Sequence, residues 1–417
     1  MKASKTFYCR AGWLVDGLGG PIRRDALLEI SDGVFGSIHG HPEDFLAVNA
    51  EIRLRTVDFS DCTLLPGLMD GHVHLSMSGT TDDAARIRQL ENGYGESREV
   101  IRFHLQRHLE HGIVAVRDGG DHHGFVARFQ QESGSHGGAD VRIRSAGRAF
   151  HAHGRYGRLI GRPPVTGRSL ADSVADDPEA KDHLKIVNSG LNSLKEYGRQ
   201  TACQFAAADL KKAVATAAAR GWKTMIHANG RLPVTDAVEA GCCSIEHGFF
   251  MGTDNLKRMA DCGTVWVPTA VTMSAYLRLM EPGSPEQSVV RRTLDHQLEQ
   301  MAAARRLGVA VVLGTDAGSP GVHHGQAVRE ELGLLMKAGF SIEEAIKCAS
   351  SAAARLLGLE AWGRIEAGGR ACWIAVKGAP DGLPGSLAQI RAIYMDGQLR
   401  YETDQGGCRS ASPPPAR

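Results

Sequence analysis

The sequence lacks the features that mark membrane, secreted and nucleic-acid-binding proteins. No stretch of its 417 residues approaches the roughly 18 uninterrupted apolar residues of a transmembrane helix. The first residues, MKASKTFYCRAGWLVDG, contain no apolar core of the kind that a secretory signal needs. The 48 Lys and Arg residues nearly balance the 47 Asp and Glu residues, which argues against a nucleic-acid or membrane-surface partner. We expect a small-molecule substrate, and the sequence leaves open a homo-oligomer.

The cysteines show no disulfide or zinc pattern. They number nine, are scattered along the chain, include the adjacent pair Cys242 and Cys243, and form no CxxC motif. An odd, scattered set of this kind is typical of reduced thiols in a cytoplasmic protein. We therefore predict a cytoplasmic location and cysteines that serve packing, not metal binding.

Length and composition indicate a large soluble enzyme-sized fold. With 42% hydrophobic and 23% charged residues, the chain can bury a sizeable core. Its length suits either a large barrel with an appendage or two to three ordinary domains.

Both ends of the chain predict short strands. Residues 1–63 and 366–405 alternate apolar and polar residues between Gly and Asp turns, with no sustained helical pattern in the first segment. We predict one small sheet domain built from both segments. The tail, 406–417, is small, polar and Pro-rich, so we expect it to be disordered.

The segment between them, 64–365, alternates short apolar runs with amphipathic stretches. A strand followed by a helix, repeated eight times, fits a (β/α)₈ barrel, whose usual size is about 250 residues before insertions. A long helical stretch, 342–359, closes this region. The predicted strands are 64–74, 113–118, 141–146, 184–188, 224–227, 244–247, 265–268 and 309–315.

The run LLPGLMDGHVHLS ends the first of these strands with His72 and His74. Alternate side chains of a strand point to the same face, so a His-x-His pair directs two imidazoles at one point. Such a pair suits a divalent metal ion, although two polar residues at a strand end would give the same pattern.

Four further candidate functional side chains lie in or at the ends of later predicted strands. Lys185 lies in the fourth strand, His227 ends the fifth, His247 ends the sixth and Asp316 follows the eighth. Functional groups of a (β/α)₈ barrel lie at the C-terminal ends of its strands. We therefore expect all six side chains to face one bowl.

In these motifs the chain resembles the amidohydrolase superfamily of metal-dependent hydrolases. The resemblance runs from about residue 64 to 359 and rests on PGLMDGHVH, IEHG, GTDAG and the helix after HHGQAVREELGLLMKAG. It is strongest to imidazolonepropionase-like and to Xaa-Pro or Xaa-Arg dipeptidase-like members. Each motif alone is weak, but together they keep their order at the spacing of eight strands. The chain ends resemble the small β-sandwich that often accompanies this barrel.

The resemblance implies a binuclear metal site. His72 and His74 with Asp316 would hold one ion, His227 and His247 would hold the other, and Lys185 would bridge them as a carbamate formed with carbon dioxide. Without carbamylation Lys185 would instead be a strand lysine paired with a carboxylate. Zinc suits these donors best, and ligand type does not exclude manganese, cobalt or iron.

The resemblance also implies a mechanism. A metal-bridging hydroxide would attack a carbonyl while Asp316 takes the proton and passes it to the leaving nitrogen, as general base and then general acid. The expected reaction is hydrolysis of an amide-like C–N bond, most readily in a dipeptide or an N-acyl amino acid. A cyclic amide, a carbamate or an ester is the alternative substrate.

Substrate-binding residues are expected in the loop after the third strand. His153 resembles the family histidine that reaches the substrate carbonyl, with His151 as its rival. Tyr156 and the basic side chains around it are candidates to bind the substrate, Arg155 and Arg158 as grips for a carboxylate. A solvated basic loop, with Arg162 as a further member, would explain the same residues. An apolar wall of the pocket, or simply core, is expected from Phe249, Phe250, Met251, Met273 and Tyr276.

Two other functions are alternatives to a binuclear hydrolase. A mononuclear deaminase of the same superfamily would lack the lysine of the fourth strand and would carry a glutamate where this chain has Gly230. A barrel that has lost catalysis and serves as a scaffold would usually have lost metal ligands, and all six are present here.

Overall fold

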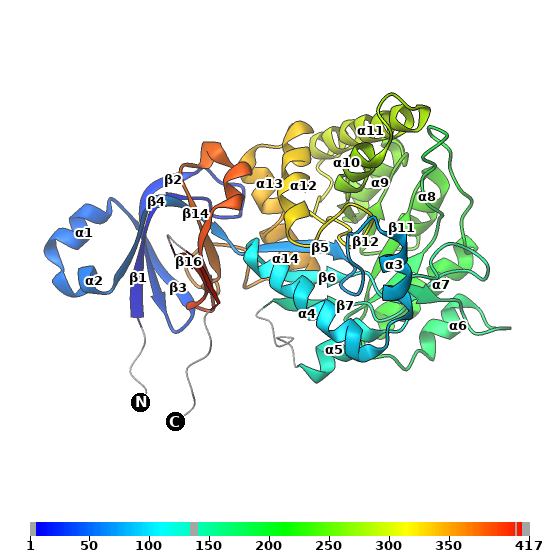
Figure 1. Cartoon of the computed structure of the whole chain (residues 1–417), viewed down its shortest axis with the longest axis horizontal. Helices are drawn as coiled ribbons and strands as arrows, with labels where there is room; N and C mark the ends of the chain where they lie inside the picture. Colours follow the sequence, from blue (N-terminus) through cyan, green and yellow to red (C-terminus); the bar gives the residue numbers. More distant parts are fainter. Residues whose placement is uncertain (1–5, 134–140, 405–406, 411–417) are drawn as a thin grey trace. The chain divides into compact units, whose positions relative to one another are not determined.

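The computed structural model describes residues 6–133, 141–404 and 407–410 (Figure 1). The chain forms two compact units. The first comprises Met1–Met69, Arg107–Val114 and Ser341–Arg417, and the second comprises Asp70–Gln106 and Ala115–Phe340.

This division differs from the predicted domains in where it puts three segments. Residues 64–69, 107–114 and 341–365 were expected in the barrel and lie in the first unit by their contacts. The predicted domain boundaries stay a prediction. The predicted disordered tail, 406–417, lies outside the described residues apart from the backbone of 407–410, which pairs with the preceding strand.

One eight-stranded sheet joins the two chain ends in the first unit, in the order β17-β16-β15-β14-β4-β1-β2-β3 (Figure 1). The C-terminal strand β14 therefore pairs directly with β4. Neighbouring strands are antiparallel except for β1 and β4, which are parallel. The strands are β1 Thr6–Leu14, β2 Arg23–Ser31, β3 Val34–Gly40, β4 Thr56–Pro66, β14 Trp373–Lys377, β15 Ile390–Met395, β16 Gln398–Asp404 and β17 Gly407–Ser410.

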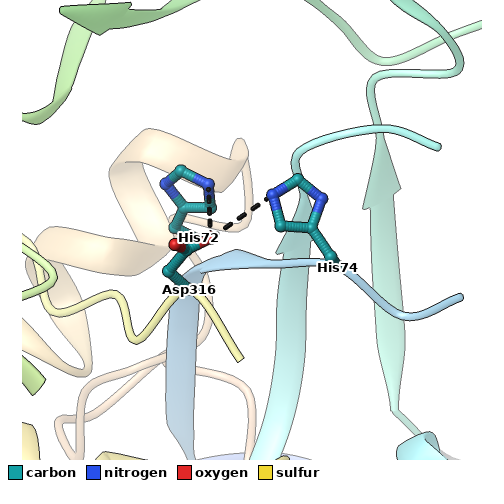
Figure 2. A group of neighbouring side chains, drawn as sticks. All are labelled: His72, His74 and Asp316. Atoms are coloured by element: carbon teal, nitrogen blue, oxygen red, sulfur yellow. Dashed lines mark ion pairs between the residues drawn. The ribbon is translucent and has the colours of Figure 1, made fainter. Parts of the chain in front are cut away.

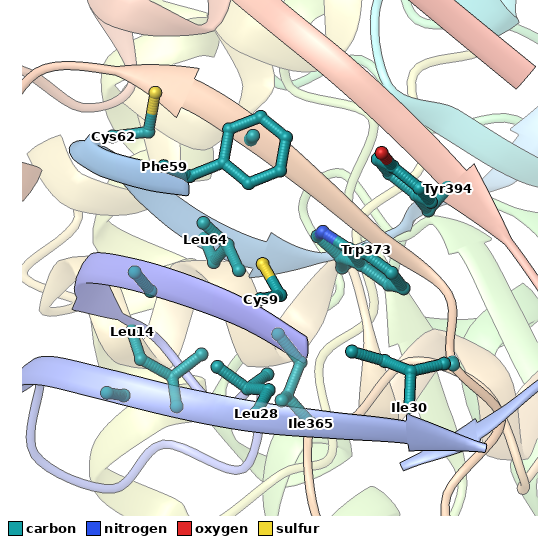
Figure 3. Packing of buried hydrophobic residues seen from close by; sticks show 14 of the residues in the cluster. Cys9, Leu14, Leu28, Ile30, Phe59, Cys62, Leu64, Ile365, Trp373 and Tyr394 are labelled. Carbon is teal, nitrogen blue, oxygen red and sulfur yellow. The ribbon is translucent and has the colours of Figure 1, made fainter. Parts of the chain in front are cut away.

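The core of this sheet follows from two-residue alternation. Leu28 and Ile30 of β2 are fully buried, and the residue between them is not. Trp373 of β14 stacks on Tyr394 of β15 with ring centroids 4.3 Å apart (Figure 3). Phe35 of β3 also reaches Trp373, at 5.8 Å, although β3 and β14 are not neighbours in the sheet. The expected sandwich is thus observed as one continuous sheet that curls around its core.

The short helices of this unit correct two expectations. Residues 1–63 contain α1 Pro42–Val48 and α2 Ala50–Leu54, where no helical pattern was seen. The predicted long helix 342–359 is two helices, α13 Ile342–Cys348 and α14 Ser351–Leu357. The break falls at Ser350, whose hydroxyl bonds to the backbone oxygen of Ile346 at 2.6 Å. Serine side chains compete with the helical backbone in this way, and single-sequence periodicity does not register it. Two 3₁₀ turns, Pro380–Gly382 and Gly385–Ala388, complete the unit.

The second unit alternates strands with helices. Its strands pair in parallel, in the orders β13-β12-β11-β10-β8-β9 and β5-β6-β7. The strands are β5 Leu68–Val73, β6 Ile113–Asp118, β7 Arg142–Ser145, β8 Ala149–Phe150, β9 Gly161–Arg162, β10 His183–Val187, β11 Lys223–Ala228, β12 Ser244–His247 and β13 Val265–Val267. The helices are α3 Asp83–Glu91, α4 Tyr94–Glu110, α5 Phe125–Glu132, α6 Leu170–Ala175, α7 Ala207–Ala219, α8 Arg231–Glu239, α9 Thr253–Cys262, α10 Val271–Leu279, α11 Pro285–Leu307 and α12 Gln326–Lys337.

Six of the eight predicted strands agree with the structure to within one residue at each end, and two do not. The predicted strand 64–74 is divided at Gly67, so that residues 64–66 belong to β4 and β5 begins at Leu68. A side chain at Gly67 would meet the side chains of Val114 and Cys372 within 3 Å, so the chain passes there only without one.

The other exception is 309–315, which forms one isolated bridge, between Val311 and Trp266, where a strand was expected. Its backbone is nevertheless bonded on both sides, with Val312 N–H donating to Trp266 O and Gly71 N–H donating to Leu313 O. Thr315 N–H turns instead to the side chain of Asp70, at 3.0 Å. A local side-chain acceptor therefore interrupts the regular ladder.

The chain has an α/β fold of the kind the alternating pattern predicts. None of the helices in the described part is both long and apolar enough to cross a bilayer. None of the eight cysteines whose side chains the structure describes forms a disulfide, as expected from their spacing.

Candidate active site

His72 is the next-to-last residue of β5, His74 directly follows the strand, and both side chains are buried. His72 Nδ1 lies 2.9 Å from a carboxylate oxygen of Glu246, and His74 Nδ1 lies 2.9 Å from the backbone oxygen of Gly120. Because these oxygens only accept hydrogen bonds, each Nδ1 carries the proton and each Nε2 keeps its lone pair. This is the arrangement in which protein imidazoles bind metal ions.

Asp316 completes this group. Its Oδ1 lies 3.4 Å from His72 Nε2 and 3.3 Å from His74 Nε2 (Figure 2). Ligand atoms of these three residues all lie within 4.8 Å of one another. Burial alone would raise the pKa of Asp316, but the nearby imidazoles of His74, His72 and His247 hold it well below its usual range. Two lone pairs and a carboxylate that face one another form a donor set that suits a cation.

The space beside the two histidines fits such a cation. A Cβ atom at Gly119 would lie 3.2 Å from both Nε2 atoms of His72 and His74. The absence of a side chain there leaves a hollow in front of these nitrogens. His72 Nε2 is buried and has no hydrogen-bond partner within the described residues.

Lys185 lies in the middle of β10 with 1% of its surface exposed. Its Nζ has no hydrogen-bond partner in the described part of the chain, so the carboxylate pairing that was the alternative for this lysine is not formed. Burial, opposed by the charges of Glu246 and Asp316, lowers the pKa of Lys185 to about 8. An unpaired ammonium so deeply buried is costly, and it is unusual without a functional reason.

His227 and His247 occupy the ends of β11 and β12, with ring centroids 4.6 Å apart. His227 Nε2 lies 3.2 Å from Gly190 O, and His247 Nδ1 lies 2.7 Å from the hydroxyl of Thr269. Burial lowers the pKa of His227 to about 4 and that of His247 to about 3. Both imidazoles are therefore neutral, which is the form that binds metals.

Three residues at or beside this site have a strained backbone. His247 and Asp316 both adopt positive φ, at 67° and 58°, and so does Thr269 at 48°. Residues other than glycine rarely hold this conformation, and structures keep it mainly where function requires it.

All six predicted metal ligands line one cavity of about 300 Å³. Tyr156, Phe249, Met273 and Tyr276 line it too, whereas Met251 is 1% exposed and belongs to the core. Cavities of this size accept small organic molecules.

The other predicted substrate residues do not line this cavity among the described residues. His153, Arg155 and Arg158 are exposed. His153 Nε2 bonds to Pro164 O at 3.0 Å, and a guanidinium nitrogen of Arg155 bonds to the backbone oxygen of Ala202 at 3.2 Å. Their roles stay predictions that their positions do not support.

The remaining members of this loop also point elsewhere. Arg162 pairs with Asp177 at 2.7 Å. His151 is buried, its Nδ1 bonded to Ala152 O at 2.9 Å, and it too is outside the cavity lining of the described chain.

The sequence did not single out Glu246, which orients His72. Glu246 is fully buried and also accepts hydrogen bonds from Arg117 at 2.7 Å and from the hydroxyl of Ser244 at 2.5 Å. The sequence did offer one signal for Glu246, which is an acidic residue within the short predicted strand SIEH. All four residues of this strand are buried in the structure. A buried acid with a buried base beside a metal ligand fixes the ligand's ring and tautomer.

The comparisons with known proteins identify the family of the chain. Residues 63–400 match the Amidohydrolase family model, and this match covers most of the chain. The chain belongs to the amidohydrolase family. It is a hydrolase that acts on carbon–nitrogen bonds.

Two curated relatives illustrate the range of similarity. Ochratoxinase from Aspergillus niger is 26% identical over 413 residues, which cover 89% of this chain and 81% of the relative. An uncharacterized protein of Mycobacterium tuberculosis is 27% identical over 302 residues, which cover 71% of this chain and 74% of that protein.

Solved structures share the fold. A Xaa-Pro dipeptidase with bound methionine in its active site aligns with a TM-score of 0.80 at 24% identity, covering 96% of this chain and 100% of that one. The ochratoxinase structure aligns with a TM-score of 0.75 at 21% identity, covering 95% of both chains.

Proposed function

We propose that this protein is a binuclear metal-dependent hydrolase of an amide-like C–N bond in a dipeptide or an N-acyl amino acid. The observation that carries the proposal is the convergence of His72, His74 and Asp316 on one hollow, with Lys185 in the wall of the same cavity. The Xaa-Pro dipeptidase among the similar structures supports the amide bond.

The proposal includes a closed (β/α)₈ barrel as the scaffold. Its support is the segment 310–317, which is bonded to β13 through Val312 N–H and Trp266 O and to β5 through Asp316 N–H and His72 O. This segment would be the eighth strand position, between the seventh and the first.

His72, His74 and Asp316 would hold one divalent ion, and His227 and His247 a second, with zinc the best match to these donors. Bound ions would polarise a carbonyl and lower the pKa of water from about 15.7 toward 7. The rings of His72 and His74 are already fixed by Glu246 and Gly120 O, so little ordering remains when an ion binds.

Lys185 would join the two ion sites as a carbamate. The ammonium group would first lose one proton. The neutral amine nitrogen would then form a bond to the carbon of carbon dioxide, one C=O π bond would open, and a second proton would leave the nitrogen, so that a cation becomes an anionic oxygen donor. The unpartnered, buried Nζ supports this, because the ammonium form has nothing to pair with.

Asp316 would move the proton. Its Oδ2 accepts a hydrogen bond from the Ser319 hydroxyl at 2.8 Å, which holds the carboxylate in the cavity wall. From there it would take a proton from the attacking water and return it to the leaving nitrogen. Tyr156, in the cavity wall with its ring 5.4 Å from that of His227, would contact the substrate carbonyl in the place first assigned to His153.

A deaminase is the weaker candidate. The glutamate that would shuttle its proton is replaced by Gly230, which begins α8 and carries no proton donor. Lys185, which deaminases lack, is present.

The test is elemental analysis followed by a hydrolysis screen. Protein purified without chelator should contain about two divalent ions per chain, and metal-loaded protein should cleave some N-acyl amino acids or dipeptides. Protein prepared in ¹³C-bicarbonate should show a carbamate carbon that is absent in Lys185→Ala. A stoichiometry near zero after zinc or manganese supplementation would refute the metal site, and cleavage of only carbamates, esters or cyclic amides would refute the substrate class.

A pair of glycine variants makes the metal test specific. Gly119→Ala should bind much less metal, because the added methyl group fills the hollow 3.2 Å from both Nε2 atoms. Gly333→Ala is the control, since a Cβ there meets no atom within 4 Å. Equal metal content in both variants would place the ions elsewhere.

A further inference from the structure

The cavity contains a basic side chain that the sequence did not suggest. Arg86, in α3, lines it together with Tyr276 and Ser319. Among the described lining residues it is the only arginine, and apart from Lys185 the only strongly basic side chain.

The guanidinium of Arg86 is held by neutral groups alone. Its Nη1 lies 3.2 Å from Ser78 O, 3.3 Å from Thr80 O and 3.1 Å from Gly318 O. No carboxylate of the described chain lies within ion-pair distance of it, whereas Arg162, of the basic loop, is paired with Asp177. Three carbonyls fix its position but leave its charge uncompensated beside the cavity.

The loop that carries Asp316 also fixes Arg86 relative to the reacting groups. Gly318 follows Asp316 by two residues, so the backbone that carries the proposed proton carrier also accepts a hydrogen bond from Arg86. Orientation of a substrate requires this kind of rigid spacing between its anchor and the catalytic group.

We propose that Arg86 binds a carboxylate of the substrate and so selects amides that carry a free C-terminal acid; this rests on the proposed amide hydrolysis. A guanidinium and a carboxylate form paired, charge-assisted hydrogen bonds. The apolar part of the substrate lies against Met273 and against Leu159 and Leu191, which line the cavity and are 39% and 55% exposed. The substrate class is an N-acyl amino acid or dipeptide with an apolar side chain.

Matched substrate pairs test this proposal. N-benzoyl-phenylalanine and its C-terminal amide offer the same scissile bond, and benzoate release reports its cleavage in both. The wild type should cleave the acid with a kcat/KM about 10- to 100-fold higher than that of the amide. Arg86→Gln should lose this preference through a higher KM for the acid, with the amide almost unchanged, and Arg86→Lys should keep part of it.

Arg88→Gln is the matched control, because Arg88 is an exposed arginine of the same helix outside the described cavity lining. It should behave as the wild type. A drop in kcat for both substrates in Arg86→Gln would mean that Arg86 only supports the loops, and equal cleavage of acid and amide by the wild type would mean that no anion site exists. Either result overturns the proposal and leaves amide hydrolysis standing.

A binding measurement separates this proposal from the function itself. If neither substrate is cleaved, the proposed hydrolysis of this class has failed. Calorimetry then measures whether Arg86 favours binding of N-acetyl-phenylalanine over its C-terminal amide. Tighter binding of the acid that disappears in Arg86→Gln supports the anion site. Equal binding of acid and amide, or a preference that survives in Arg86→Gln, refutes it.

Discussion

The sheet core of the first unit and the centre of the second unit both bury strand side chains completely, but they bury opposite kinds of group. The sheet core consists of apolar side chains such as Leu28, Ile30 and Trp373 (Figure 3). The centre of the second unit buries Lys185 and Glu246 to 1% exposure or less, along with the histidines of the site. Burial of apolar side chains stabilises the first region, whereas burial of charged side chains has a cost in free energy in the second.

The two regions also differ in whether their buried polar atoms have hydrogen-bond partners, and this difference points to the candidate active site. Glu246 is compensated by Arg117, Ser244 and His72. Lys185 Nζ and His72 Nε2 have no partner among the described residues, and both line the cavity. In the sheet core Trp373 Nε1 also lacks one, but it is a single neutral N–H group. Uncompensated groups at a cavity mark the place that a ligand is expected to fill.

The largest effect is expected for Asp316→Asn. The amide keeps the shape and an oxygen ligand but cannot carry a proton, so kcat should fall by about 10²- to 10⁴-fold with the fold intact. Kinetics with the best substrate of the screen, together with the melting temperature, would measure it. Asp295→Asn, an exposed residue of α11, is the control. Near-normal turnover of Asp316→Asn would assign the proton to another group.

A change in the sheet core should lower stability and leave the site intact. Leu28→Ala removes a fully buried side chain, so the free energy of unfolding should fall by about 2–5 kcal/mol. Metal content per folded chain should not change. Denaturant unfolding would measure the loss, with Leu399→Ala as the control because Leu399 is 37% exposed. Equal losses in both variants would mean that the core is loosely packed at Leu28.

Short-range patterns made the histidines of the cavity wall predictable. His72, His74, His227 and His247 lie at or directly after the ends of runs whose apolar periodicity is plain, and parallel strands bring their C-terminal ends together. The sheet of the chain ends was predictable for the same reason, because its strands alternate with a period of two.

What sequence reasoning missed depends on contacts between distant segments. Glu246 meets Arg117 across 129 positions, and Arg86 meets Gly318 across 232. No periodicity encodes such pairings. The basic loop around Arg155 and Arg158 attracted attention through composition alone, and composition does not say which way a side chain points.

Lys185→Met compares the burial of a charged side chain with that of an apolar one at the same position. In metal-free protein, replacing an unpaired buried ammonium by an apolar side chain of similar length should raise the free energy of unfolding by about 1–3 kcal/mol. With metal present the order should reverse, because wild-type protein gains about 2.7 kcal/mol at a metal concentration 100 times its Kd.

Lys211→Met, at an exposed position of α7, is the control and should change little under either condition. Loss of stability in metal-free Lys185→Met would show that the lysine has a partner in the apo protein. Chemical denaturation with and without chelator makes the comparison.

The smallest effect is a pH dependence of stability from Glu331, a buried residue of α12. Its carboxylate accepts the N–H groups of Ala270 and Val271, at 3.0 and 2.7 Å, at the open N-terminus of α10. Burial, with further contributions from Asp70 and Glu330, raises its pKa from the usual 4.5 to about 8, against the effect of the two N–H groups. Between these values the folded state holds one proton more than the unfolded state.

The stability from this proton is therefore complete below pH 4.5 and is lost as the pH rises toward 8, with a slope of at most about 1.4 kcal/mol per pH unit. Glu331→Gln cannot lose a proton, so the stability of wild type relative to this variant should decline from pH 5 to pH 8. Glu281→Gln, at an exposed position, should leave the pH profile of the wild type unchanged. Urea unfolding across this range measures both. A constant difference between wild type and Glu331→Gln would mean that the two N–H groups keep Glu331 ionised throughout, and that burial in this unit costs less than the Lys185 comparison implies.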